Sequence, residues 1–247
     1  MKQKESLKTI TYVTIFSIAM GLFEAVVVIY LREIYYPEGF SFPLKMIEPH
    51  IAIFEICREA ATLLMLLMIG FLAAKRAVIR FAYFLLSFAI WDIFYYVFLK
   101  LFIDWPESLL TWDILFLIPI TWIGPVIAPV INAITMTVLA LIIIDASRKT
   151  SDRIISRLSW LLLITGSLIT IFGYIQDYGN FIMKEFTFLE LFTSSNSNAM
   201  LKYAATYVPD SFNWWIFILG EIVIIAGIAI IIKSSCRHLV TSSLRHE

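Results

Sequence analysis

The stretch TITYVTIFSIAMGLFEAVVVIYL, residues 9–31, decides the fold. Its only charged residue is Glu24, and a helix of about 20 apolar residues is enough to cross the roughly 30 Å of hydrocarbon in a bilayer. Three lysines precede it, as they would precede a secretory signal, but no small-residue cleavage site follows. We therefore expect a spanning helix that is retained in the mature chain.

Five more stretches have the same character, and the whole composition agrees with them. The chain is 60% hydrophobic and 15% charged, with a mean hydropathy of +0.86, which is far from the averages of soluble domains. We predict an all-α, polytopic transmembrane helix bundle that forms a single membrane domain over residues 1–247, with the lipid bilayer as its main partner. The predicted spans are 9–31, 51–74, 79–103, 126–145, 157–176 and 213–233.

Lys and Arg residues are distributed unequally between the two sets of alternate loops. By the positive-inside rule, the richer set lies in the cytoplasm, so both termini are predicted to be cytoplasmic, in a cell-membrane protein. The residues of the richer set are Lys2, Lys4, Lys8, Lys75, Arg76, Arg80, Arg148, Lys149, Arg153, Arg157, Lys233, Arg237 and Arg245. The other set holds Arg32, Lys45, Lys100, Lys184 and Lys202.

An apolar segment with three prolines, residues 114–129, precedes the fourth span. Each internal proline removes a backbone hydrogen bond and clashes with the preceding turn, so a straight helix is not expected there. We predict a proline-broken segment, either a short outer helix or a re-entrant segment. Together with the loops 32–50 and 177–212, it would cover the outer end of the bundle.

Ionisable residues fall inside four of the predicted spans. Each costs roughly 2.5 to 3.5 kcal/mol at the centre of a membrane helix, so such residues usually have a partner or a function. At a rise of 1.5 Å per residue, their positions fall within a slab about 10 Å thick in the outer half of the membrane. These residues are Glu24, Glu55, Arg58, Glu59, Asp92 and Glu221.

The local spacing predicts how these groups pair. Glu55, Arg58 and Glu59 share one helical face, so we expect Arg58 to organise both glutamates. Tyr96 lies one turn from Asp92, where its phenol could donate a hydrogen bond to a buried carboxylate.

Five acids against one arginine leave an excess of negative charge that a dry bundle cannot hold. Our leading hypothesis is an outer cavity that binds or relays a cation, a proton or a cationic small solute. The predicted binding residues are Glu24, Glu55, Arg58, Glu59, Asp92, Tyr96 and Glu221. The alternatives are an intramembrane enzyme that uses paired carboxylates on a lipid or lipid-linked substrate, a non-catalytic subunit of a membrane complex, and a purely structural charge network.

Cofactor classes are narrowed by the residues present. The three histidines, at positions 50, 238 and 246, lie outside the middle of the spans, so haem is not expected, and no Gly-rich phosphate loop predicts a nucleotide. A bound divalent cation with oxygen ligands is still possible, and the candidate ligands are Glu24, Glu55, Glu59 and Asp92. The zero net charge gives no reason to expect a nucleic-acid partner. The sequence does not decide whether the protein forms an oligomer or binds a partner subunit. It also indicates no particular catalytic residue.

Four runs of sequence carry a resemblance. They are EAVVVIYLREIYYP at 24–37, REAATLLML at 58–66, WDIFYY at 91–96 and WPESLLTWDILFLIP at 105–119. In these runs the chain resembles an uncharacterised family of prokaryotic polytopic membrane proteins. The resemblance covers about residues 20–130 and implies a membrane architecture without implying a substrate.

Overall fold

The computed structural model describes residues 2–149, 154–187 and 197–243. Six helices in this part of the chain are long and apolar enough to cross a membrane, which confirms the predicted all-α bundle. The elements in chain order are α1 (Lys2–Tyr35), α2 (Pro49–Ala73), α3 (Ala77–Ile103), β1 (Trp112–Phe116), β2 (Trp122–Pro125), α4 (Ile127–Lys149), α5 (Arg157–Ile182), α6 (Ser197–Ala204) and α7 (Trp214–Ser243).

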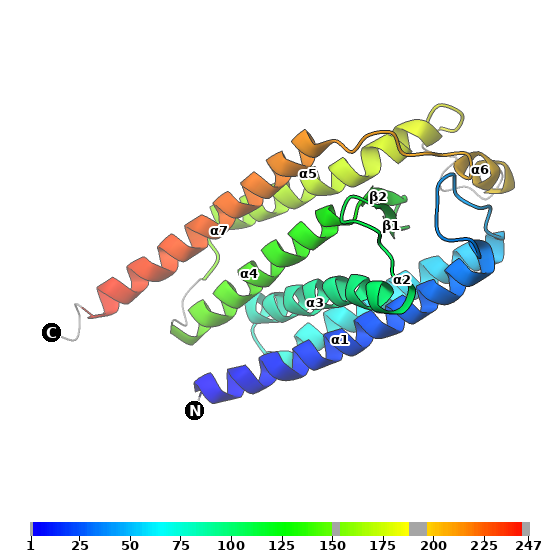
Figure 1. The fold of residues 1–247 in the computed structure, drawn as a ribbon. Helices are drawn as coiled ribbons and strands as arrows, with labels where there is room; N and C mark the ends of the chain where they lie inside the picture. The colour runs from blue at the N-terminus through cyan, green and yellow to red at the C-terminus, as the bar shows by residue number, and fades with distance from the viewer. Residues whose placement is uncertain (1, 150–153, 188–196, 244–247) are drawn as a thin grey trace.

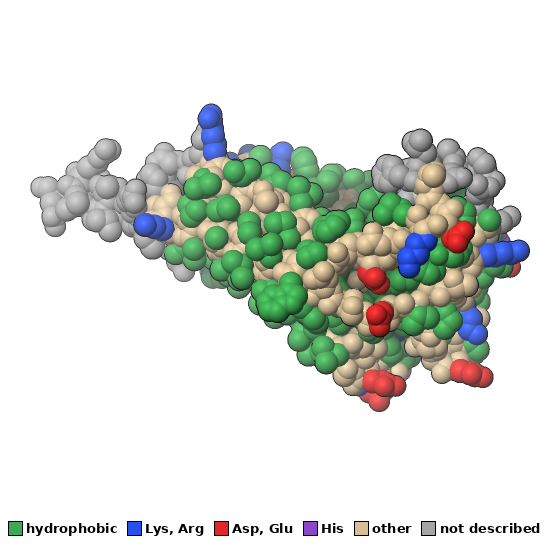
Figure 2. Space-filling model, turned by 90° about the horizontal axis from the view of Figure 1, so that it is seen from above, with side chains coloured by type: hydrophobic (Ala, Val, Ile, Leu, Met, Phe, Trp, Pro, Cys, Tyr) green, Lys and Arg blue, Asp and Glu red, His purple; other side chains and the backbone are tan. Residues whose placement is uncertain are grey.

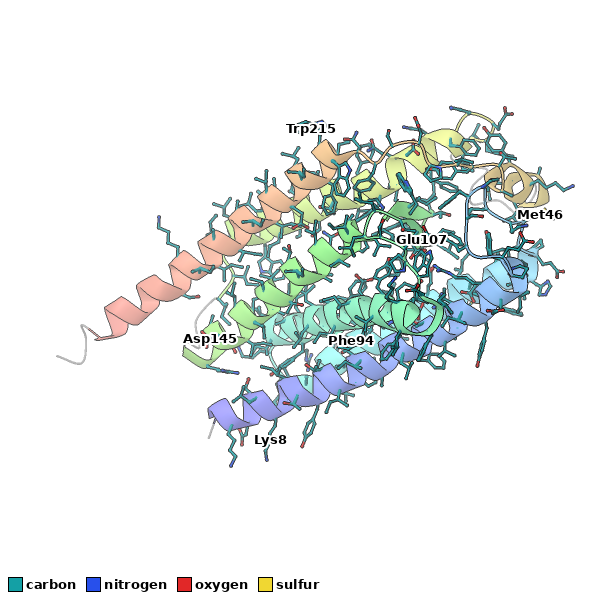
Figure 3. All side chains as sticks on the ribbon, in the orientation of Figure 1. Lys8, Met46, Phe94, Glu107, Asp145 and Trp215 are labelled. Carbon is teal, nitrogen blue, oxygen red and sulfur yellow. The ribbon has the colours of Figure 1, made fainter. Side chains whose placement is uncertain are left out.

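The long helices run side by side, and α1 begins at the same end of the molecule at which α7 ends (Figure 1). We call this the terminal end, and the opposite end, which carries α6, the hairpin end. Lys8 and Asp145 lie near the terminal end, whereas Met46 and Glu107 lie toward the hairpin end (Figure 3). An even number of spans places both chain ends on one side of the membrane.

Helix α3 packs against α1, α2 and α4, whereas α5 packs mainly against α7. Helix α4 connects the two groups, because it also contacts α7. The bundle therefore has an α1–α2–α3 half and an α5–α7 half, joined through α4. Buried apolar residues from both groups meet in one core near the terminal end, among them Leu86, Ile143 and Ile228.

Small residues allow close helix contacts in both halves. A Cβ added at Gly21 of α1 would lie 2.8 Å from the carbonyl oxygen of Trp91 on α3. A Cβ at Gly166 of α5 would lie 2.8 Å from the carbonyl oxygen of Gly220 on α7. These separations are too short for a side chain, so glycine is required for the helices to approach this closely.

The outside of the bundle is apolar along most of its length. Figure 2 shows a broad hydrophobic surface, on which the visible acidic side chains all lie in the half that carries α6. Leu72 and Trp215, for example, are 83% and 84% exposed. A soluble protein does not expose a surface of this kind, and the chain is an integral, multi-pass membrane protein.

The predicted interruption before the fourth span is confirmed, and it takes the form of a β-hairpin rather than a short helix. Strands β1 and β2 pair antiparallel, with Trp112 opposite Pro125 and Asp113 opposite Gly124. The ring of Phe116 stacks on Phe88, which lies 15 residues before the end of α3 at Ile103, or about 22 Å along the helix axis. The hairpin thus enters the bundle, where protein surrounds its irregular backbone.

Candidate functional site

Arg58 on α2 binds two carboxylates. Its Nε donates to Glu55 Oε2 at 2.8 Å, and its Nη1 donates to Glu24 Oε1 on α1. Thr62 Oγ1, one turn further along α2, donates to the other oxygen of Glu24 at 3.3 Å. The predicted pairing of Arg58 with Glu55 is found, and Glu24 completes a triad with both oxygens occupied.

Glu59 does not belong to that triad, so the expectation that Arg58 organises it was wrong. Both of its carboxylate oxygens accept the backbone N–H of Leu117, at 3.1 and 2.9 Å. Leu117 directly follows β1, where the chain leaves the ladder and an N–H needs a partner. The hydrogen bonds of Arg58 go to Glu55 and Glu24 instead. Glu59 therefore anchors the hairpin to α2.

A second ion pair lies nearer the hairpin end, and sequence reasoning missed it. Arg32 Nη2 donates to Asp113 Oδ1 at 3.1 Å, and the guanidinium stacks 3.7 Å from the ring centroid of Trp105. Tyr96 donates its hydroxyl hydrogen to Asp113 Oδ2 at 3.2 Å, so its partner is Asp113 and not Asp92 as expected. The apolar run ends at Leu31, which predicts a loop from Arg32 onward, but α1 continues to Tyr35.

Burial dominates the electrostatics of Asp113. Removal from water raises the pKa of its carboxyl to about 6, although Arg32, the Ile114 backbone N–H and the Tyr96 hydroxyl all lower it. The charged pair with Arg32 is consequently complete only above this pH.

Among the described residues, neutral groups hold Glu221 on α7. Asn132 Nδ2 donates to its Oε1, and Thr135 Oγ1 donates to its Oε2 at 2.7 Å, both from α4. Tyr174 of α5 donates to the Asn132 carbonyl oxygen and fixes the orientation of the amide. The buried Glu221 therefore has two neutral hydrogen-bond donors, and a third neutral side chain, Tyr174, is bonded to one of them. No cation is among its hydrogen-bond partners in the described part of the chain.

Asp92 on α3 differs from all these acids. It is 9% exposed, and among the described residues its carboxylate has no hydrogen-bond partner. It lines two cavities at once, which also share Leu115 and Phe116 of the hairpin. A buried, unpaired carboxylate at the junction of two cavities is available to bind a group that enters either of them.

The first cavity, which we call the polar compartment, has a volume of about 50 Å³. It brings together five of the predicted site residues: Glu24, Arg58, Glu59, Asp92 and Tyr96. Glu55 joins this group only through Arg58. The volume is enough for a few water molecules or a small ion, but not for an organic solute.

The second cavity, which we call the apolar cavity, has a volume of about 420 Å³ and lies among α3, α4, α5 and α7. Its lining is mostly apolar; Asp92, Asn132, Thr135, Tyr174 and Glu221 form its polar end, and Ser167 and Thr170 of α5 are its other polar side chains. Glu221 therefore lines a different cavity from Glu24 and Glu59, and Asp92 is the one predicted acid that lines both. Sequence reasoning predicted the acids but not this division.

The candidate metal ligands are not assembled as one centre. Within the ranges that the structure describes, no three or more His, Cys, Asp or Glu side chains are arranged to hold a metal ion. Glu24 and Glu55 bind Arg58, and Glu59 binds the Leu117 N–H.

The expected cover of the site is found in part. Leu115, Phe116 and Trp122 of the hairpin line the cavities, as the proline-rich segment was expected to do. Residues 188–196 of the expected cover lie outside the described residues.

No protein-family model, no curated protein and no solved structure matches this chain. The resemblance carried by residues 20–130 therefore stays a prediction, and the function is argued from the geometry alone.

Proposed function

We propose that the protein binds one positive charge at Asp92, either as a proton or as the head group of a cationic solute. The observation that carries the proposal is that this buried carboxylate has no hydrogen-bond partner among the described residues and faces both cavities. An isolated carboxylate in a medium of low dielectric constant attracts a proton or a cation much more strongly than it would in water.

The charge balance around Asp92 supports this proposal. Arg58 compensates one of its two glutamates, and Arg32 compensates Asp113. Glu59, Asp92 and Glu221 have no ion-pair partner among the described residues, so the region keeps an excess of negative charge. A proton or cation that enters the polar compartment is attracted by all the surrounding acids, and of the three acids that line the compartment Asp92 alone has no hydrogen-bond partner among the described residues.

Orientation follows from the loop charges. We place both termini in the cytoplasm and the hairpin end outside, in the cell membrane. The polar compartment would then exchange protons or ions with the external side, past the hairpin.

A second candidate function is favoured by one observation. The apolar cavity ends at two carboxylates, Asp92 and Glu221, as an intramembrane enzyme acting on a lipid or lipid-linked substrate would require. Two carboxylates in different surroundings, one unpaired and one hydrogen-bonded, can divide acid and base roles between them. A role as a subunit of a complex would require a surface for a partner helix, and the close helix contacts at Gly21 and Gly166 are made within the chain instead.

The test is an infrared measurement of the carboxyl groups. Purified protein in lipid nanodiscs is titrated with acid and base, and the carbonyl band of protonated carboxylic acids is followed in the wild type and in Asp92→Asn. We expect a titrating band that Asp92→Asn removes. Asp210→Asn, which changes a carboxylate in an exposed segment between α6 and α7, is the matched control and should leave this band in place.

If the spectra of the wild type and Asp92→Asn agree over the whole pH range, Asp92 takes up no proton. The second form of the proposal, a cationic head group bound at Asp92, is then tested by adding dodecylamine, an alkylammonium probe. If dodecylamine also leaves the spectrum of the wild type unchanged, the proposal is refuted.

A further inference from the structure

The walls of the apolar cavity form a trough that is open along one side. Helix α4 packs against α3 and α7, and α7 packs against α5, but α3 and α5 do not pack against each other along their length. The floor of the trough is consequently made by α4 and α7, and its two rims are α3 and α5. The gap between the rims faces the surroundings of the bundle, which in a membrane protein are lipid.

The exposure of the α5 rim supports this opening. Ile164 and Leu168 line the cavity, yet they are 54% and 61% exposed. Ser167 between them also lines the cavity and is exposed. Side chains that face both a cavity and the outside mark a lateral entrance, so a molecule dissolved in the bilayer can reach the cavity without crossing water.

The trough has a closed apolar end and a polar end. Toward the terminal end it is closed by Phe81 of α3 and Trp160 of α5, whose ring centroids lie 5.1 Å apart. On the floor, the lining of α4 extends from Pro129 to Leu139, which is about 15 Å along the axis. This length is about half of the roughly 30 Å hydrocarbon core, or one leaflet.

The polar end specifies the chemistry of a ligand. Asp92 and Glu221 supply negative charge, and only Glu221 is already hydrogen-bonded. The indole Nε1 of Trp122, which also lines the cavity, is buried without a hydrogen-bond partner among the described residues. A ligand head group that fits this end has a positive charge to pair with Asp92 and an oxygen that accepts a hydrogen bond from the Trp122 N–H.

From these features we propose that the apolar cavity binds a single-chain amphiphile with a protonated amine head group, which enters from the bilayer between α3 and α5. Its alkyl chain lies along α4 toward the Phe81–Trp160 contact, and its amine binds Asp92 beside Glu221. A hydroxyl oxygen near the amine accepts the Trp122 N–H. The inference rests on the proposed function, since it uses Asp92 as the group that binds the positive charge, and it adds the class of solute.

The test compares three probes that share a chain and differ in head-group charge: dodecylamine, dodecanol and dodecanoate. Full-length protein in phosphatidylcholine nanodiscs is equilibrated with each probe, and the molecules bound per chain are counted by native mass spectrometry. We expect one dodecylamine per chain, with an affinity at least ~10-fold above that of dodecanol, because the ion pair adds about 1.4 kcal/mol or more. Dodecanoate should bind least.

Variants at the entrance separate the cavity from the lipid surface. Ser167→Trp fills the entrance and should abolish dodecylamine binding, whereas Thr165→Trp, at an exposed position on the same helix outside the cavity lining, should bind as the wild type does. Asp92→Asn should remove the preference for dodecylamine over dodecanol. Equal binding of the three probes, or unchanged binding in Ser167→Trp, would overturn the inference.

The inference and the proposed function fail in different ways. If Asp92→Asn removes the titrating carboxyl band but no variant affects dodecylamine binding, the amphiphile site is refuted and the proton site stands. If Ser167→Trp abolishes binding while Asp92→Asn changes neither the band nor the amine preference, the trough binds a chain, and both the amine head group and the role of Asp92 are refuted.

Discussion

Two arginines bind three carboxylates in and beside the α1–α2–α3 half of the bundle, whereas neutral donors from the connecting helix α4 hold Glu221 of the α5–α7 half. Arg58 binds Glu24 and Glu55, and Arg32 binds Asp113 of the neighbouring hairpin. Glu221 has an amide and a hydroxyl instead. Asp92, between the two halves, has neither among the described residues.

The difference indicates which acids stabilise the fold and which are free to act. A carboxylate bound by arginine is costly to disturb, because removing one partner leaves a buried charge without compensation. A carboxylate held by neutral donors can change its charge while its hydrogen-bonding groups stay in place. We therefore assign a structural role to the arginine-bound acids and a ligand-binding role to Asp92 and Glu221.

The largest effect is expected for Arg58→Met. It leaves the buried Glu24 and the half-buried Glu55 without their cation, so the free energy of unfolding should fall by about 3 to 5 kcal/mol. Thermal unfolding in a mild detergent measures the change, with the exposed Lys184→Met as the control. The double variant Glu24→Gln, Arg58→Met should recover part of the loss. A single variant as stable as the wild type would show that the triad is not structural.

A smaller effect is expected for Asp113→Asn, which leaves Arg32 unpaired. Arg32 keeps its stacking on Trp105, so we expect a loss of about 2 to 3 kcal/mol rather than the full cost of breaking a buried pair. Replacing both partners, as in Arg32→Met with Asp113→Leu, should cost less than the single change. If the double variant is less stable than Asp113→Asn, the attraction within the ion pair exceeds the cost of burying its two charges, and the pair stabilises the hairpin.

The α5–α7 half should respond to packing rather than to charge. A Cβ at Gly220 would lie 2.2 Å from Thr170 Oγ1 and 2.8 Å from the Thr170 backbone nitrogen, so Gly220→Ala should cost about 1 to 3 kcal/mol. Gly173→Ala on α5 is the matched control, because its nearest neighbour would lie at 3.5 Å, an ordinary contact. Unfolding curves of the two variants that coincide would contradict the close approach of α5 and α7.

The smallest effect on stability is expected for Glu221→Gln. The amide keeps one acceptor for Asn132 or Thr135 and loses a buried charge, so the change should stay within about 1 kcal/mol. Glu24→Gln, measured in parallel, should cost more because it removes a partner of Arg58. If Glu221→Gln lowers the stability more than Glu24→Gln does, the proposed difference between arginine-bound and neutrally held acids is wrong.

Local patterns in the sequence predicted the architecture well. Each span is a long apolar run, and the positions of Pro119, Pro125 and Pro129 required a break before α4. The pairing of Arg58 with Glu55 follows from a spacing of three residues on one helix. These features depend on neighbours in the chain, which the sequence displays directly.

The partners that lie far apart in the chain were not predictable in this way. Arg32 and Asp113 are 81 residues apart, and Glu59 and Leu117 are 58 apart. Both pairings arise because the proline-rich segment folds as a hairpin that enters the bundle, whereas a helix at the surface would have left Asp113 outside. Asn132 and Glu221 are 89 residues apart, and their contact depends on the rotation of α4 toward α7, which no single helix specifies.

The most direct test of the central claim reads the charge of Asp92 itself. Carboxyl carbons of all aspartates are labelled with ¹³C, the protein is placed in phosphatidylcholine nanodiscs, and the Asp92 signal is assigned by its loss in Asp92→Asn. We predict that this signal moves with pH and moves again when dodecylamine is added, while the Asp113 signal responds to pH alone. An Asp92 signal that stays fixed under both treatments would contradict the claim that this carboxylate binds positive charge.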